Sequence, residues 1–381
     1  MDPARQYASE LNVVERLGLD FLQRRIDRRE PRIRRWSPGE VAEVRRIERR
    51  LIGLAALSGA VVGGVLGFLE IGFRTWMLEE GAASGWREQI PYWTAYMAVT
   101  VLVSGVEILY LYWLVLRSVA RIGSIAGLSL STGDIEHVIG VGLSRAALDL
   151  PNPYGPIYGI DPYARTSRWK LTAYSVLYRL KVGVTSFLFR VVLRRVLARA
   201  AVRFVIPLAA IPAFAVWNGL IIRWILREAR IRAAAPVAIE ELAERMTADK
   251  ASLTEGGREL LLASLAEAIV RSQDAHPNFV LLLMRLCRDL EISPESARGD
   301  WESTRHALGN ADPETQDVVL ASLTLAAMLD GAPRRAQRSF LEEAHELCGR
   351  PFEAEALGAA HRCFIEGQGL EGLRGTPDRR R

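Results

Sequence analysis

LIGLAALSGAVVGGVLGFLEIGF, residues 51–73, is a 23-residue run made almost entirely of apolar and small residues. It carries one charge, Glu70, and as a helix it would rise about 34 Å, enough for a hydrocarbon core of about 30 Å. A second run of equal length, TAYMAVTVLVSGVEILYLYWLVL at residues 94–116, is interrupted only by Glu107. Because apolar runs this long rarely serve a soluble core, the two predict a transmembrane helical hairpin over residues 51–116.

The flanking charges predict how this hairpin is oriented. Residues 1–50 contain thirteen arginines, whereas the connection from Arg74 to Trp93 holds only Arg74 and Arg87 as basic residues. By the positive-inside rule the N-terminus faces the cytoplasm. We therefore expect a multi-pass protein of the bacterial inner (cytoplasmic) membrane, with the N-terminus and the C-terminal domain on the cytoplasmic side.

The composition of the chain divides into two parts. Up to Pro236 there are 32 basic and 19 acidic residues, a net charge of +13, whereas the remainder has 17 and 25, a net charge of −8. Eight of the nine tryptophans lie in the basic part, and all three cysteines lie in the acidic part. This composition excludes a disordered, disulfide-stapled or collagen-like protein, and unpaired cysteines suit a reducing cytoplasm.

Small residues mark one face of the first run. Gly59, Gly63 and Gly67 recur at a spacing of four, which lets another helix backbone approach closely inside a membrane. The second run is the expected packing partner, and a homodimer through the same face is the alternative.

Two carboxylates are the costly residues of the hairpin. A charge near the bilayer centre costs about 2.5–3.5 kcal/mol. Glu70 lies near the outer end of its run, about 15 Å in depth from Glu107, so the two cannot pair and Glu70 reaches the outer interface. Glu107 needs a proton, a buried partner or a water-filled site, which makes it the candidate functional residue of the hairpin.

Residues 1–50 form the expected cytoplasmic basic helical region, and residues 117–235 a membrane-associated one. In the first, Ser37-Pro38-Gly39-Glu40 predicts a capped helix start. In the second, an apolar stripe alternates with arginines that we expect at lipid headgroups: Arg190, Arg194, Arg195, Arg199 and Arg203.

The hydrophobic segment at residues 204–222, FVIPLAAIPAFAVWNGLII, contains Pro207 and Pro212 and ends near the polar Asn218. Arginines flank both ends, which favours a kinked, re-entrant or interface-lying segment with both ends cytoplasmic; a full third span is the alternative. With its basic preamble, the stretch at about 185–235 resembles the membrane-associating region of EcsC-like bacterial proteins.

Residues 236–370 read as a cytoplasmic helical domain, followed by a tail at 371–381. Helix starts are indicated at Ser252 with Glu255, Ser293-Pro294-Glu295 and Asp312-Pro313-Glu314. LASL occurs twice, at 262–265 and 320–323. This internal repeat, together with the segment LAAMLDG that leads into SFLEEAHEL, resembles the TerB-like domain of tellurite-resistance and stress-associated bacterial proteins.

The TerB resemblance implies metal-binding acidic residues after the Asp-Gly turn, but this chain has Pro333, Arg334, Arg335 and Gln337 there. Only Asp330 is carried over from that site. His345 and Cys348, which share a helix face, are the other candidate metal ligands. Buried cysteines and solvated histidines are the alternative interpretation of that pair, and the sequence commits to no metal.

No catalytic motif, phosphate loop or CxxC pair is present, so neither an enzyme nor a cofactor is indicated. The expected fold is all-α: a transmembrane hairpin with membrane-associated helices, then a soluble TerB-like bundle. Our leading hypothesis is an integral membrane protein that presents a cytoplasmic interaction domain, in envelope or metal stress as the TerB resemblance implies. The alternative is a transport or channel component that uses Glu107. The expected partners are the lipid bilayer, its anionic headgroups and a protein partner of the C-terminal domain, with no nucleic acid.

Overall fold

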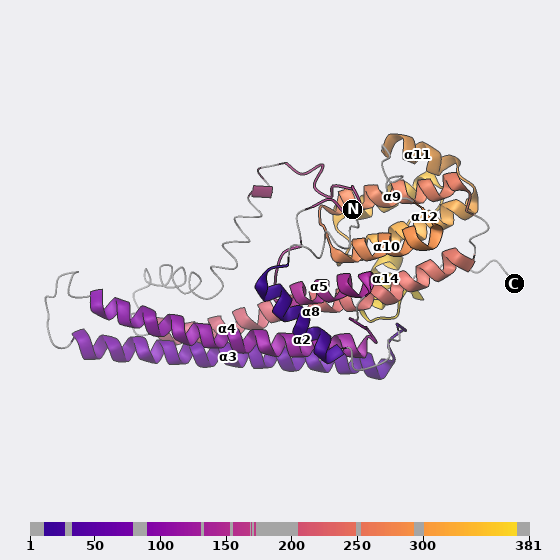
Figure 1. The fold of residues 1–381 in the computed structure, drawn as a ribbon. Coiled ribbons are helices and arrows are strands. Elements are labelled where there is room, and N and C mark those ends of the chain that lie inside the picture. Colours follow the sequence, from indigo (N-terminus) through magenta and orange to yellow (C-terminus); the bar gives the residue numbers. More distant parts are fainter. Residues whose placement is uncertain are drawn as a thin grey trace. The chain divides into compact units, whose positions relative to one another are not determined.

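The structure is a computed structural model that describes residues 11–26, 33–78, 90–130, 133–152, 155–167, 169, 171–172, 205–248, 253–292 and 301–371. Within these residues the fold is all-helical, as expected, and the only pairing of extended backbone is an isolated bridge between Ile157 and Ile160. The helices are α2 (Val13–Ile26), α3 (Pro38–Leu78), α4 (Ile90–Ile125), α5 (Asp134–Ala147), α8 (Val205–Ala248), α9 (Glu255–Ser272), α10 (Pro277–Leu290), α11 (Trp301–Asn310), α12 (Pro313–Ala326), α13 (Arg335–Leu347) and α14 (Ala354–Ile365) (Figure 1).

The chain forms two compact units. Unit 1 comprises Met1–Val44, Val119–Ser167 and Arg227–Arg381, and unit 2 comprises Arg45–Ser118 and Arg168–Leu226. Sequence alone places a domain boundary at residue 236, whereas in the structure that position lies inside α8. Unit 1 also contains α2 and α5, so it is assembled from three separate parts of the chain.

In unit 2, α3 and α4 are the helices that hold the two apolar runs. Two stretches, Pro38–Leu69 and Thr94–Ile125, are long and apolar enough to cross a membrane. The start of α3 agrees with the sequence: Glu40 accepts hydrogen bonds from the backbone and hydroxyl of Ser37, and Ser37 Oγ accepts one from the Glu40 backbone at 3.3 Å. This is the predicted capping box.

The helix α8 excludes the re-entrant form of the segment predicted at residues 204–222, whereas the kinked and interface-lying forms stay predictions. It runs unbroken for 44 residues, through Pro212 and Pro236, so the chain does not turn back on itself between Val205 and Ala248. Each proline removes one backbone donor. Pro207 lies in the first turn, where that donor would have no helical partner anyway.

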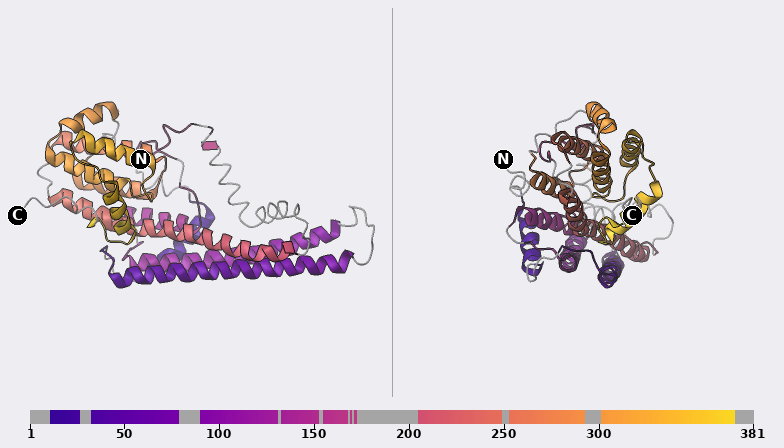
Figure 2. Two further views of the ribbon diagram at one scale, coloured as in Figure 1. Left: turned by 180° about the vertical axis from the view of Figure 1, so that it is seen from behind. Right: turned by 90° about the vertical axis from the view of Figure 1, so that its right-hand side faces the viewer.

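Contacts within unit 2 place α8 antiparallel to α3. Gly219 faces Ile52 and Ala56, Gly59 faces Phe214, and Gly64 faces Ile211, so numbers fall along α8 as they rise along α3. Figure 2 shows the two helices side by side. Extended along this register, Val205 lies level with residues near Leu69. The apolar part of α8 therefore covers nearly the full height of the first apolar run.

Unit 1 packs its helices around a conventional apolar core. The two LASL segments lie on α9 and α12, which pack on each other, and their serines, Ser264 and Ser322, are fully buried. The predicted start at Asp312 is confirmed, since its carboxylate accepts from the Thr315 backbone at 2.9 Å. At α9 the N-cap is Thr254, and the predicted Ser252 lies outside the described residues.

The segment before α3 joins the C-terminal end of the same unit. The Trp36 backbone donates to the Gly367 carbonyl at 3.0 Å, and its indole is buried against this glycine. Gly367 has φ +68°, and a side chain there would overlap the indole, so only glycine fits. Arg35 adds an ion pair with Glu241, with Nε 2.5 Å from Oε1.

Candidate functional site

The strongest candidate site lies inside unit 2, where α4 and α8 exchange a polar contact. Asn218 Nδ2 donates a hydrogen bond to Glu107 Oε1 at 2.8 Å, and only 6% of Glu107 is exposed. The structure thus brings together the two polar residues that the sequence singled out on separate apolar runs. The sequence predicts that Glu107 needs a proton, a buried partner or a water-filled site, and the structure provides a buried partner.

Gly59 of α3 makes this contact possible. A Cβ added at Gly59 would collide with the Phe214 carbonyl oxygen and lie 2.9 Å from Asn218 Nδ2. Gly59, Gly63 and Gly67 are all buried, as a small-residue packing face requires. At Gly59 the partner is α8, however, and the expected packing of this face on the second run is not what the structure has there.

The depth of the site follows from the register. Gly59 lies eight residues into the first run, so the Glu107–Asn218 contact is about 12 Å from its beginning. Glu70 lies eleven residues beyond Gly59, about 16 Å along α3. Its side chain is outside the description, as are those of the candidate headgroup arginines: Arg190, Arg194, Arg195, Arg199 and Arg203.

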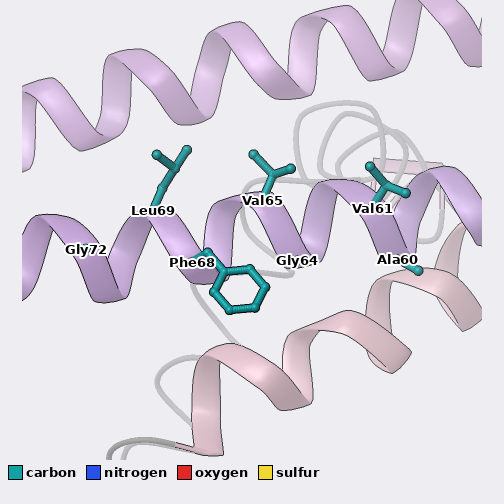
Figure 3. A pocket seen from close by; sticks show the side chains of 7 residues that line it. All are labelled: Ala60, Val61, Gly64, Val65, Phe68, Leu69 and Gly72. Carbon is teal, nitrogen blue, oxygen red and sulfur yellow. The ribbon is translucent and has the colours of Figure 1, made fainter.

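A shallow apolar groove runs along α3 above the site (Figure 3). It is lined by Ala60, Val61, Gly64, Val65, Phe68, Leu69 and Gly72. In Figure 3, Val61, Val65 and Leu69 point to one side of α3 and Phe68 to another. None of these side chains can bind a charged or polar substrate, so the groove adds only apolar surface to the unit.

A second polar cluster, which the sequence did not reveal, lies in unit 1. Glu228 Oε1 is 2.9 Å from Arg232 Nη2 and 2.8 Å from His276 Nε2. Arg232 is 5% exposed and also donates to the Gly142 carbonyl and to Asn152 Oδ1. Burial raises the pKa of Glu228, but attraction to Arg232 and then to His276, with their hydrogen bonds, holds that pKa well below its ordinary value.

His276 is the buried end of this cluster, with 1% of its surface exposed. Its Nδ1 accepts the Asn278 backbone N–H at 3.2 Å and caps α10, so Nε2 carries the proton that Glu228 accepts. Both ring nitrogens are therefore engaged. The void beside Arg232 measures about 10 Å³, room for about one water molecule, so the cluster is a structural junction.

The candidate metal ligands are Asp330, His345 and Cys348, and protein groups surround each of them. Asp330 receives Gln337 Nε2 at 3.0 Å and has Arg334 Nη2 at 3.6 Å, and burial raises its pKa. Burial also lowers the pKa of His345 and raises that of Cys348. Among the described residues, no group of three or more His, Cys, Asp or Glu side chains is arranged to hold a metal ion.

Arg334 and Gln337, the departures from the TerB pattern, now have a physical role. Arg334 lies near Asp330 and within 3.9 Å of Asp274, the acidic residues that follow the two LASL copies. A guanidinium thus stands beside the carboxylates where a cation would bind. Comparisons with models of protein families, with curated proteins and with solved structures found no match to this chain.

The close approach at Gly59 predicts that adding a side chain at this position lowers the stability of the protein. Gly59→Ala should destabilise the protein by about 1–3 kcal/mol, because the Phe214 backbone cannot yield. Gly53→Ala is the matched control on the same helix, since nothing lies within 4 Å of its added Cβ. Thermal unfolding of both full-length variants in detergent compares them, and equal midpoints would contradict this packing.

The low pKa of Glu228 predicts a pH-dependent effect. Its carboxylate contributes stability that is fully present above the ordinary Glu pKa of 4.5 and is lost as the pH falls through the lower folded-state pKa. Glu228→Gln should therefore cost about 2–3 kcal/mol at pH 7, where it leaves Arg232 buried beside a neutral amide. In chemical unfolding, the difference in free energy of unfolding between the variant and wild type should become smaller below pH 4.5. A difference that does not change with pH would refute the ion-pair explanation.

Proposed function

We propose that the protein is an integral protein of the bacterial inner membrane, in which unit 2 crosses the bilayer and unit 1 is a cytoplasmic interaction module. One observation carries this proposal: the helices of unit 2 direct large apolar side chains outward. Only 39% of the most apolar window in α3, and 17% of that in α4, is buried. A core helix of a soluble protein would have most of that surface covered.

The outward apolar surface extends over α3, α4 and α8, the helices of unit 2 that the structure describes. Val101, Leu102 and Leu109 of α4 are 65–70% exposed, and Phe68 of α3 is 66% exposed. On α8, Val216 is 61% exposed. Lipid tails solvate such residues without a free-energy penalty, whereas their exposure to water costs about 25 cal/mol for each Å² of apolar surface. A bilayer is therefore the environment that this surface fits.

We further propose that α8 is a third membrane-spanning helix. Its antiparallel register covers about the same height as the first apolar run, about 26 Å from Val205 to Ile222. Arg45, Ser118 and Leu226, where the chain passes out of unit 2, then fall at one end of the three helices. Since α8 begins at the opposite end, we also propose that residues 168–204 return the chain across the bilayer, because only an even number of crossings keeps every part of unit 1 on a single side.

Charges at that end support a cytoplasmic orientation. The exposed arginines of unit 2 there are Arg45, Arg46, Arg49, Arg50, Arg117 and Arg223. Arg117 also lies over the ring of Trp113, 5.5 Å from its centroid, and half of Trp224 is exposed nearby on α8. Arginines beside interfacial tryptophans are typical of the cytoplasmic headgroup region, so anionic lipid headgroups are the proposed partners here.

The proposed protein-binding surface lies on α2. Val13, Val14 and Leu17 are 72%, 56% and 64% exposed, whereas Leu19, Leu22 and Ile26 hold the helix on unit 1. Apolar residues gathered on one exposed face are typical of a protein contact. The TerB resemblance makes envelope or metal stress the proposed setting, and homodimerisation is the alternative use of such a surface.

The alternative function is transport or channel activity through Glu107. The observation that favours it is the burial of a carboxyl group inside unit 2, at about 12 Å from the beginning of the first run. Against a solute pathway, the groove along α3 is lined only by apolar side chains and glycines. We therefore place the anchored interaction module first.

The proposed topology predicts cysteine accessibility. In a cysteine-free protein in intact cells, Glu302→Cys in unit 1 should be shielded from a membrane-impermeant maleimide, whereas Ser84→Cys, between the two apolar runs, should react. Permeabilisation should expose both positions, which serves as the control. Labelling of Glu302→Cys in intact cells would overturn the cytoplasmic placement of unit 1.

The interaction surface predicts a loss of binding on substitution. Full-length protein purified from its own membranes should co-purify with a specific partner or with a second copy, and Leu17→Glu should abolish that recovery while Leu17→Met retains it. Comparable unfolding midpoints would show that the variants fold. Equal recovery with both variants would contradict a role for the α2 face.

A further inference from the structure

A polar stripe on α4 leads to Glu107. Tyr96, Thr100, Ser104 and Glu107 follow at spacings of four, four and three, which puts them on one face of the helix. Thr100 and Glu107 are 4% and 6% exposed, whereas Val101 and Val106 on other faces are 65% and 62% exposed. The polar face of α4 therefore turns into unit 2, and its apolar faces turn out.

The Thr100 hydroxyl is the unusual member of the stripe. A helical threonine ordinarily donates to the carbonyl four residues earlier. Among the residues that the structure describes, however, the buried Thr100 Oγ1 has no hydrogen-bond partner. A buried hydroxyl in this state is unfavourable unless a small polar species completes its bonding. It lies seven residues from Glu107, about 10 Å along α4.

The neighbouring helices add few groups that can titrate at this level. On α3 the described side chains from Leu51 to Leu69 include no acid or base, and on α8 those from Ile211 to Ile222 include none. Arg223 lies five residues beyond Asn218, and α4 itself contributes the phenols of Tyr96, Tyr110 and Tyr112. Glu107 is thus the acid toward which the stripe leads.

We propose that Glu107 is a proton-binding site and that Tyr96, Thr100 and Ser104 form its access path from the end of unit 2 at which α4 begins. The Glu107 carboxylate takes one proton from hydronium, leaving water, and becomes a neutral carboxyl group. Asn218 donates to Oε1 in both states. This inference goes beyond the interaction module and rests on the proposed bilayer crossing of unit 2.

Carbodiimide labelling of the full-length protein in phosphatidylglycerol vesicles tests the proposal. A protonated carboxyl adds across a carbodiimide, its proton passing to nitrogen and its oxygen to the central carbon, with no leaving group. Dicyclohexylcarbodiimide should add to the peptide that contains Glu107, faster as the pH falls. Glu107→Gln should lose the label, and Glu70→Gln, the matched control in the other apolar run, should keep it.

The access path is tested with a water-soluble carbodiimide. Thr100→Val should slow labelling of Glu107 about tenfold, as loss of one hydrogen-bonded step of about 1.4 kcal/mol predicts. Its unfolding midpoint should equal or exceed that of wild type, because the substitution removes a buried, unsatisfied hydroxyl. Ser104→Ala should also slow labelling.

Absence of label on Glu107 at every pH would overturn the proton site. Labelling that is unchanged in both the Thr100 and Ser104 variants would overturn the path. Extraction of every variant by alkaline carbonate separates the two proposals, because wild-type protein released from the vesicles would refute the bilayer crossing itself. Retained protein with an unreactive Glu107 would refute only the proton site.

Discussion

The close approach of α3 and α8 at Gly59 is the constraint on which unit 2 depends. With no side chain at Gly59, the Phe214 carbonyl can lie against α3, and this brings Asn218 to the level of Glu107. A larger residue would separate the helices and leave two polar groups buried without each other. In an apolar environment that loss is severe, because water cannot replace the missing partner. The small residue at Gly59 therefore permits both the close helix packing and the pairing of the two buried polar groups.

The two units bury charge in different ways. Unit 1 surrounds Arg232 with Glu228, Asn152 and a backbone carbonyl, so that a buried cation is paired and hydrogen-bonded. Unit 2 offers Glu107 a neutral amide as its described donor. A neutral N–H can donate to a carboxyl oxygen in either protonation state, whereas a salt bridge requires the charged one. Asn218 can therefore keep its hydrogen bond to Glu107 in both protonation states, as the proposed proton site requires.

The likeness to TerB-like domains stays a proposal, but the residues that depart from that pattern form a coherent set. Arg334 and Gln337 both contact Asp330, and Arg334 also approaches Asp274. A fixed side-chain cation in this place provides the charge compensation that a divalent ion would provide elsewhere. The acidic residues after each LASL copy then have a structural role that is independent of any metal.

Much of the fold was determined by the sequence itself. Two apolar runs, the Ser37–Glu40 capping box and the Asp312 cap each depend on residues close together in the chain, and each appears as predicted. Contacts between distant parts of the chain, by contrast, could be found only in the three-dimensional structure. Gly59 could have packed on α4 as well as on α8, and α8 continues through Pro212, although the prolines and flanking arginines favoured a kinked, re-entrant or interface-lying segment. Glu228 and Arg232 have the i,i+4 spacing of a helical ion pair, but His276 caps the start of another helix, so sequence spacing could not place it beside them. Periodicity specifies which face of a helix is buried, but which surface covers that face depends on complementary shape and charge brought from distant parts of the chain.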